Sequence, residues 1–282
     1  TRLPTQTDDA VATSAALATQ GGVDWLVVDH YAWSAPAESM QRGAAQSIAV
    51  IDDLADRPHD CDLLVDTNLT PATAYDALIP SAAQRLIGPR YALLRPQFAA
   101  ARRLQVTEKG GADVRILVFC GGTDAQGATL KVLQAVSAAA LADVQVDVVA
   151  GAANPHLAAI TDACAVLPGA NLNVQVADMA AHMVNADLFV GAGGSSSWER
   201  CCLGLPGIVF STADNQRAQN ADLARIGAQI DLGAVETLDI PRLAETIRAL
   251  AHQPEVRACM AAQARDLVDG LGASRVAERL LA

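Results

Sequence analysis

Short apolar segments of strand length alternate with segments of helical pattern along most of this chain. The apolar segments are continuous runs, as expected of strands that are buried on both faces of a sheet. Strands that alternate with helices in this way form parallel sheets covered by helices. The expected strands are residues 25–29, 48–52, 63–66, 85–87, 116–120, 144–150, 172–174, 188–190, 208–210 and 229–231, and the expected helices include 8–20, 128–141, 155–165, 179–186, 197–203 and 215–226.

The alternation occurs twice, and a polar segment separates the two series. Residues 102–113 include Lys109-Gly110-Gly111 and have no apolar periodicity, which is typical of a linker between domains. We therefore predict an α/β protein of two Rossmann-like domains, residues 1–107 and 113–282, with a ligand cleft between them. The residues after 240 are expected to be helical and to belong to the second domain. A helical pattern precedes the first strand, so the N-terminal domain is expected to be incomplete.

The charge of the chain disfavours two classes of partner. It has 31 acidic and 20 basic side chains and a formal net charge of −11, and an acidic chain repels nucleic acid and anionic membrane surfaces.

No apolar run has the length of a membrane span, and no signal peptide is visible. The six cysteines form no CxxC pair and no Cys/His group with zinc spacing. We expect a cytoplasmic protein with reduced thiols, no cofactor, no metal and no stable membrane association.

The strongest functional motif is the stretch 187–206, DLFVGAGGSSSWERCCLGLP. An apolar strand is followed by a glycine turn, three serines and a helical pattern. Such a junction presents backbone N–H groups and the positive end of a helix dipole, which bind phosphate. The pattern is neither G-x-G-x-x-G nor a P-loop nor G-x-S-x-G. We therefore interpret Gly194, Ser195 and Ser196 as donors to phosphate, and Glu199, one turn into the helix, as an acceptor for the hydroxyls of a ribose.

Three more loops follow strands of the same series. Gly121-Gly122-Thr123-Asp124 follows one strand, Asn154 follows the next, and Asn215-Gln216 opens the helix after residues 208–210. Thr123, Asp124 and Asn154 are also good helix caps, and that alternative stays open. The carboxyl ends of parallel strands lie at one edge of a sheet, where ligands of such folds bind. Together these loops predict a site for a nucleoside diphosphate sugar.

Two segments of the first series carry polar side chains after a strand. His30 and Tyr31 follow residues 25–29, where a histidine could act as a base and a tyrosine could donate to a sugar hydroxyl. Residues 51–62 hold five aspartates, Arg57 and His59. Their spacing is not that of an EF-hand, and we favour pairing of aspartate with arginine over metal binding.

Several long motifs of the chain occur together in one known family. They are WLVVDHY, IDDLADRPHDCDLLVD, GPRYALLRPQF, ILVFCGGTD and GAGGSSSWERCCLGLP, followed by ADNQ. In this order they resemble the UDP-2,4-diacetamido-2,4,6-trideoxy-β-L-altropyranose hydrolases of pseudaminic acid biosynthesis, a pathway associated with flagellin glycosylation. That family is similar in fold to the MurG-type glycosyltransferases, so the resemblance implies the two-domain fold called GT-B.

The resemblance also implies a site and a reaction. UDP would contact Gly121, Gly122, Thr123, Asn154, Ser195, Ser196 and Glu199, with Asn215 and Gln216 facing the sugar and Tyr31 lining the catalytic cleft. Water would attack the anomeric carbon and UDP would leave, with no metal. The substrate would be a UDP-linked sugar, and nucleic acid would not be a partner.

One expected motif of that family is not found in this sequence. The family places its catalytic histidine in a GxGH loop after a first strand, and none of His30, His59, His156, His182 and His252 follows such a loop. We therefore expect a truncated chain, with His30 as a substitute base as the alternative. Two other functions stay open: a GT-B glycosyltransferase that uses a UDP-sugar, and a catalytically incomplete fragment that binds a nucleotide sugar.

Overall fold

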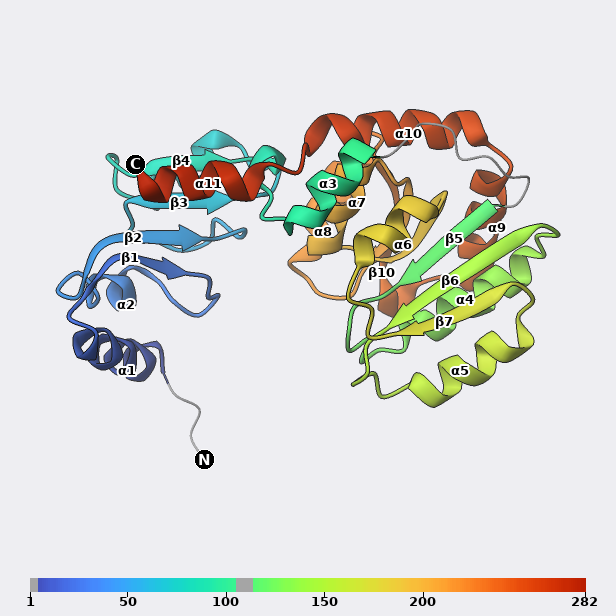
Figure 1. Ribbon diagram of the computed structural model, residues 1–282, viewed down its shortest axis with the longest axis horizontal. Helices are drawn as coiled ribbons and strands as arrows, with labels where there is room; N and C mark the ends of the chain where they lie inside the picture. Colours follow the sequence, from blue (N-terminus) through green and yellow to red (C-terminus); the bar gives the residue numbers. More distant parts are fainter. Residues whose placement is uncertain (1–4, 105–113) are drawn as a thin grey trace. The chain divides into compact units, whose positions relative to one another are not determined.

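The computed structural model describes residues 5–104 and 114–282, which form two compact units (Figure 1). The first unit comprises the described residues up to Leu93 together with Leu271–Ala282, and the second comprises Leu94–Gly270. Each unit contains one sheet in which all strands are parallel. The predicted fold class, an α/β protein with two Rossmann-like units, is confirmed.

The first unit is built on a four-stranded sheet in the order β1-β2-β3-β4. The strands are β1 (Val23–Val28), β2 (Ala45–Ile51), β3 (Leu63–Asp66) and β4 (Gln84–Ile87), and the helices are α1 (Gln6–Thr19), α2 (Ala35–Ser39), α11 (Gly272–Leu281) and the 3-10 turns η1 (Ala72–Tyr75) and η2 (Pro89–Tyr91). Thr5 and Asp8 form a capping box that begins α1. Ala10 of α1 packs on one face of the sheet, and Val276 of α11 packs on the other.

The second unit is built on a six-stranded sheet in the order β10-β9-β8-β5-β6-β7. Its strands are β5 (Val114–Phe119), β6 (Val144–Ala150), β7 (Ala170–Val174), β8 (Leu188–Ala192), β9 (Gly207–Ser211) and β10 (Gln229–Ala234). Its helices are α3 (Pro96–Leu104), α4 (Ala128–Ala139), α5 (Leu157–Val166), α6 (Met179–Asn185), α7 (Ser195–Leu203), α8 (Gln216–Arg225), α9 (Ile240–Ala251) and α10 (Pro254–Leu267), with the 3-10 turn η3 (Val235–Thr237). Strands β8 and β9 are buried along their whole length, as the continuous apolar runs predict.

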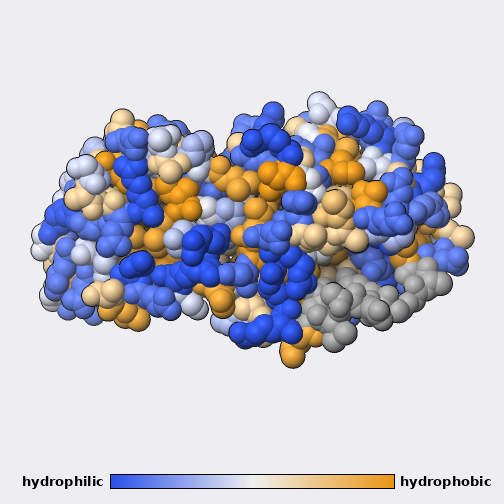
Figure 2. Space-filling model, turned by 90° about the horizontal axis from the view of Figure 1, so that it is seen from above, coloured by the Kyte–Doolittle hydropathy of each residue, from blue (hydrophilic) through white to orange (hydrophobic). Residues whose placement is uncertain are grey.

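Helices cover both faces of the second sheet (Figure 1). Helices α4, α5 and α9 bury apolar side chains in one core with β5, β6 and β8. Helices α3, α6 and α10 pack against α7 on the other side. The surface seen in Figure 2 is mixed, with hydrophobic patches lying between hydrophilic residues.

Three expectations about the domains differ from the units that the structure forms. Residues 102–104, expected in the linker, belong to α3, and the rest of that predicted linker, 105–113, lies outside the described residues. Helix α3 lies in the second unit rather than the first. Helix α11, expected in the second domain, lies in the first unit because Val276 buries its side chain against β2, β3 and β4.

Candidate functional site

The candidate site lies where the strand order of the second sheet reverses. Strand β5 is flanked by β6 and β8, so the chain leaves β5 in one direction and later continues from β8 in the other. The two strands end side by side, with Phe119 opposite Gly191. In open parallel sheets the ligand lies beyond the carboxyl ends of the strands at such a reversal. The loops after β5 and β8 therefore form the candidate ligand site.

The turn after β8 has its shape because two glycines allow it. A Cβ atom added at Gly193 would lie 2.1 Å from Oδ1 of the fully buried Asn220, so no larger residue fits there without a shift. Gly194 has φ +103°, in the region that favours glycine. Helix α7 begins at the next residue, Ser195. The turn thus brings the first N–H groups of α7, which have no partners within the helix, to the end of the strand.

The three serines of α7 have different surroundings. Ser195 is exposed at the helix start, Ser196 is half-buried and its hydroxyl donates to the carbonyl of Ala192 at 3.3 Å, and Ser197 is buried. The hydroxyl of Ser197 has no hydrogen-bond partner among the described residues. No histidine is bonded to any of these hydroxyls in the described part of the chain. The arrangement suits donors to an anion better than a nucleophile with its base.

Glu199 follows Ser195 by four residues and so lies on the same face of α7. It is half-buried, and its Oε1 accepts from the guanidinium of Arg95 at 3.3 Å. Burial raises the pKa of Glu199, and the charge of Arg95 opposes that rise. The carboxylate and the start of α7 therefore offer an acceptor and an anion site on one helix face.

The loops after β5 and β6 are joined to one another. A Cβ atom added at Gly151 would lie 2.1 Å from the carbonyl oxygen of Gly122, so the two backbones touch. Nε2 of His156 lies 3.2 Å from the carbonyl oxygen of Ala125, which ties the loops a second time. Sequence reasoning did not assign this role to His156, whose partner is distant along the chain.

In these loops some polar groups support the fold, and others are free to contact a ligand. The carboxylate of buried Asp124 accepts from the N–H groups of Ala128 and Thr129 at 2.8 and 2.9 Å, so it caps α4 as the sequence suggested, whereas Thr123 is exposed beside it. Oδ1 of buried Asn154 accepts from the N–H of His156 at 2.8 Å, and its Nδ2 has no partner among the described residues. Asn154 therefore shapes the turn before α5 and retains one donor.

The loop after β9 reaches the glycine turn. Oε1 of Gln216 accepts from the backbone N–H of Thr212 at 2.9 Å, and Nε2 would lie 3.3 Å from a Cβ added at Gly194. The amide of Gln216 is thus brought beside the turn that the sequence singled out. Asn215 is exposed at the start of α8.

In the first unit, His30 and Tyr31 lie exposed just after β1. Nδ1 of His30 accepts from the backbone N–H of Ala32 at 3.1 Å. The hydroxyl of Tyr31 donates to Oδ2 of Asp53 at 3.3 Å, and burial raises the pKa of Asp53. The structure therefore gives Tyr31 a carboxylate partner that the sequence did not assign to it.

The first unit also holds a polar network that is buried at its centre, and part of it was predicted from the sequence. Arg57 pairs with Asp52 at 2.9 Å and Arg42 pairs with Asp60 at 2.7 Å, so the expected pairing of aspartate with arginine is confirmed. In the described part of the chain, no group of three or more His, Cys, Asp or Glu side chains could hold a metal ion.

The deepest members of this network are His59, Glu38 and Tyr75. Nδ1 of His59 lies 2.7 Å from Oε1 of Glu38, and the hydroxyl of Tyr75 contacts carboxylates at 3.0 Å. Burial disfavours the charged imidazole, but the carboxylates of Asp52 and Glu38 raise the pKa of His59 to about 9. Sequence reasoning missed Glu38 and Tyr75, because no local pattern relates either residue to its partners, which follow other strands or loops.

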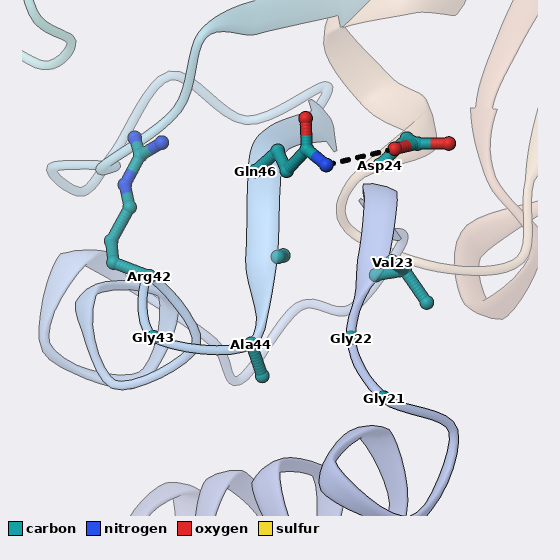
Figure 3. Close-up of a pocket in the computed structure, with 9 residues that line it drawn as sticks. Gly21, Gly22, Val23, Asp24, Arg42, Gly43, Ala44 and Gln46 are labelled. Atoms are coloured by element: carbon teal, nitrogen blue, oxygen red, sulfur yellow. Dashed lines mark hydrogen bonds between the residues drawn. The ribbon is translucent and has the colours of Figure 1, made fainter.

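A separate polar hollow lies at the opposite edge of the first sheet, at the starts of β1 and β2. Nε2 of Gln46 donates to Asp24 across this hollow at 3.0 Å, and Arg42 stands apart from that pair (Figure 3). The guanidinium of Arg42 is bound to Asp60 and Asp62. The hollow therefore lies at the amino ends of these strands, away from the edge that carries Tyr31.

Each of the two units is an α/β unit with a parallel sheet, and this is the architecture of GT-B proteins. The second unit has a glycine turn and a helix start at its strand reversal. Residues 115–280 match the model of the glycosyltransferase family 28 C-terminal domain, and the chain belongs to that family. Among the described helices, none has both the length and the apolar composition needed to cross a bilayer.

Similar proteins agree with this class. The chain is 35% identical over 191 residues to the spore coat polysaccharide biosynthesis protein SpsG of Bacillus subtilis, a match that covers 67% of this chain and 56% of that relative. The structure of this chain is similar to that of Acinetobacter baumannii MurG, with a TM-score of 0.68, 15% identity and coverage of 98% of this chain and 78% of MurG. It is also similar to the UDP-GlcNAc 2-epimerase of Neisseria meningitidis bound to UDP-GlcNAc, with a TM-score of 0.67, 13% identity and coverage of 98% and 81%.

Proposed function

We propose that this protein cleaves the bond between a sugar and UDP, with water as the acceptor. The observation that carries the proposal is the start of α7 at the strand reversal, where Gly194 and Ser195 present donors beside Glu199. The family of the chain supports a nucleotide sugar as the ligand. The structural relative bound to UDP-GlcNAc has the same fold.

We assign the nucleotide to the second unit. The diphosphate lies against the first turn of α7 and the hydroxyls of Ser195 and Ser196, where the helix dipole favours negative charge. Gly122 and Thr123, in the adjoining loop, leave room for the ligand to approach the backbone. Nδ2 of Asn154 is a further donor, and Glu199 accepts from the ribose. Asn215 and Gln216 are assigned to the sugar.

In the reaction, the oxygen of water forms a bond to the anomeric carbon while the bond from that carbon to the diphosphate oxygen breaks. The electron pair of the broken bond stays on UDP, and the donors at α7 stabilise this charge as it develops. The proton of water passes to a base, for which we propose His30 in this chain. Tyr31 and His30 are the residues of the first unit that we assign to the reacting sugar, and Asp53 is bonded to Tyr31.

For the sugar we propose the UDP-linked 2,4-diacetamido-2,4,6-trideoxy sugar of pseudaminic acid biosynthesis, in the cytoplasm. The long motifs of the sequence carry this choice, together with the name of the Bacillus relative, a polysaccharide biosynthesis protein. The chain spans 56% of the length of that relative.

A second candidate is transfer of the sugar to an acceptor hydroxyl, which the glycosyltransferase family favours. One assay separates the two. The protein is incubated with the UDP-linked diacetamido sugar, and UDP release is followed with and without added acceptor alcohols. Release without acceptor supports hydrolysis, and release that requires an acceptor supports transfer. If the protein binds the UDP-linked sugar but releases no UDP under either condition, its function is to bind a nucleotide sugar.

A further inference from the structure

Arg95, near the start of the second unit, pairs with Glu199, the carboxylate that we assign to the ribose. Arg95 precedes α3, and its guanidinium donates to Glu199 at 3.3 Å. The side chain of Glu199 is 20% exposed, whereas that of Arg95 is 52% exposed. The carboxylate therefore faces its charge partner from a largely desolvated position, where such a pair is less screened than on an open surface.

Arg95 is held in this position by the packing of α3 on α7 (Figure 1). Its guanidinium lies over the ring of Phe98, 5.4 Å from the ring centre, and Phe98 is fully buried. At the other end of α3, Arg102 donates to the carbonyl of Cys202 at 2.8 Å, near the end of α7. A cation stabilises the carboxyl end of a helix. Helix α3 is thus attached along α7, which keeps the backbone of Arg95 close to Glu199, and the contact with Phe98 supports its guanidinium there.

The spacing of Ser195 and Glu199 along α7 suits the separation between the diphosphate and the ribose hydroxyls of a nucleotide. Glu199 lies four residues beyond Ser195, which is about 6 Å along a helix. A diphosphate at the helix start would place its ribose near the carboxylate. An ionised carboxylate accepts hydrogen bonds only, and the two hydroxyls of a ribose can both donate to it. A 2′-deoxyribose offers one donor fewer.

We propose that Arg95 is a positioning residue that holds the Glu199 carboxylate as the acceptor for a ribose diol, so that the second unit selects ribonucleoside over 2′-deoxyribonucleoside diphosphates. The inference rests on the proposed function, because it takes the ligand to be a nucleoside diphosphate. It adds a residue of the GPRYALLRPQF motif to the nucleotide site. It also predicts a selectivity that the turn at Gly194 alone would not produce.

Calorimetric titration of the full chain with UDP and with 2′-deoxy-UDP tests the proposal. Hydrogen bonds to a charged group discriminate by roughly 10-fold or more, so the unsubstituted protein should prefer UDP by about that factor. Arg95→Ala should weaken UDP binding by about 10-fold and 2′-deoxy-UDP binding by less, because the deoxyribose makes only one of the two hydrogen bonds to Glu199. Arg95→Lys should restore part of the preference, because it retains the positive charge.

Two further variants separate positioning from general effects. Arg90 of the first unit lies over the ring of Tyr91 at 5.3 Å, as Arg95 lies over Phe98, and is not among the residues assigned to the nucleotide, so Arg90→Ala is the matched control and should retain the preference. Glu199→Gln should lose the preference, and adding Arg95→Ala to it should change nothing more, as expected of two residues that act together.

The outcomes are distinguishable. A chain that binds neither nucleotide overturns the proposed function and the role of Arg95 with it. UDP binding with no preference, or an equal loss of both nucleotides in Arg95→Ala, overturns the role of Arg95 alone. If Arg95→Ala does not fold, Arg95→Lys and Glu199→Gln still decide the question through the ratio of the two affinities.

Discussion

At the scale of single residues, the candidate site depends on the glycine turn after β8. Gly193→Ala would place a methyl group 2.1 Å from Oδ1 of Asn220, whose Nδ2 is bonded to Ser211. We expect a loss of about 1–3 kcal/mol in the free energy of unfolding, as for other overpacked positions. UDP affinity should fall as the start of α7 shifts. Urea unfolding and calorimetric titration measure the two effects.

The control for this variant is another glycine with space around it. A Cβ atom added at Gly43 meets no atom within 4 Å, so Gly43→Ala should change neither stability nor UDP affinity appreciably. UDP binding by Gly193→Ala at the affinity of the parent chain would show that the glycine turn does not hold the ligand.

The buried histidine of the first unit predicts a dependence of stability on pH. The folded state favours charged His59, whose pKa is raised to about 9. A group with a raised pKa contributes its full stability below its unfolded pKa of about 6.5, and the contribution disappears as the pH rises through about 9. The first unit should lose on the order of 2–3 kcal/mol over this interval.

Hydrogen exchange, corrected for the pH dependence of the intrinsic rates, measures this loss in peptides of β2 and β3. Strands of the second unit are the internal control, and His59→Gln should remove the dependence. Protection of β2 and β3 that is the same at pH 6.5 and pH 9.5 would contradict a charged, paired His59.

At the scale of elements, the sequence predicted the strands well and some of the helices poorly. All the expected strands are present, because a continuous apolar run between glycines and polar loops has few other uses in a chain that alternates with helices. Helices α2 and α3 were not expected, since α2 is short and the last residues of α3, 102–104, were assigned to the linker. Local pattern also does not tell which sheet a terminal helix will cover, as α11 shows.

Helix α11 provides a test at this scale. Val276 packs against Leu63, Val65 and Leu86, so Val276→Asp would bury a charge without a partner and uncover the sheet. We expect the first unit to lose about 2–4 kcal/mol of stability and the second unit to lose none. Leu281→Asp, at a position that is 87% exposed on the same helix, is the matched control. Equal destabilisation of both units by Val276→Asp would contradict the division of the chain.

At the scale of the whole molecule, the candidate site could be predicted only where its parts follow strands. The turn at Gly194 and the amide at Gln216 come together because neighbouring parallel strands end at one edge. Arg95 could not be assigned to Glu199 in this way, since it lies 104 residues away along the chain and follows no strand of the second sheet. Only the packing of α3 on α7 brings the two together.

The two units should also respond differently to ligand. A nucleotide that binds only the folded second unit stabilises it by about 2.7 kcal/mol at a concentration of 100 times its Kd. UDP should therefore slow hydrogen exchange in the loops after β5, β8 and β9 and in α7 of the full chain, and leave β1–β4 unchanged. Glu199→Gln at the same UDP concentration should show less protection in α7. Protection by UDP that falls mainly on the first unit would move the nucleotide site away from the strand reversal, and with it the roles given to Ser195, Glu199 and Arg95.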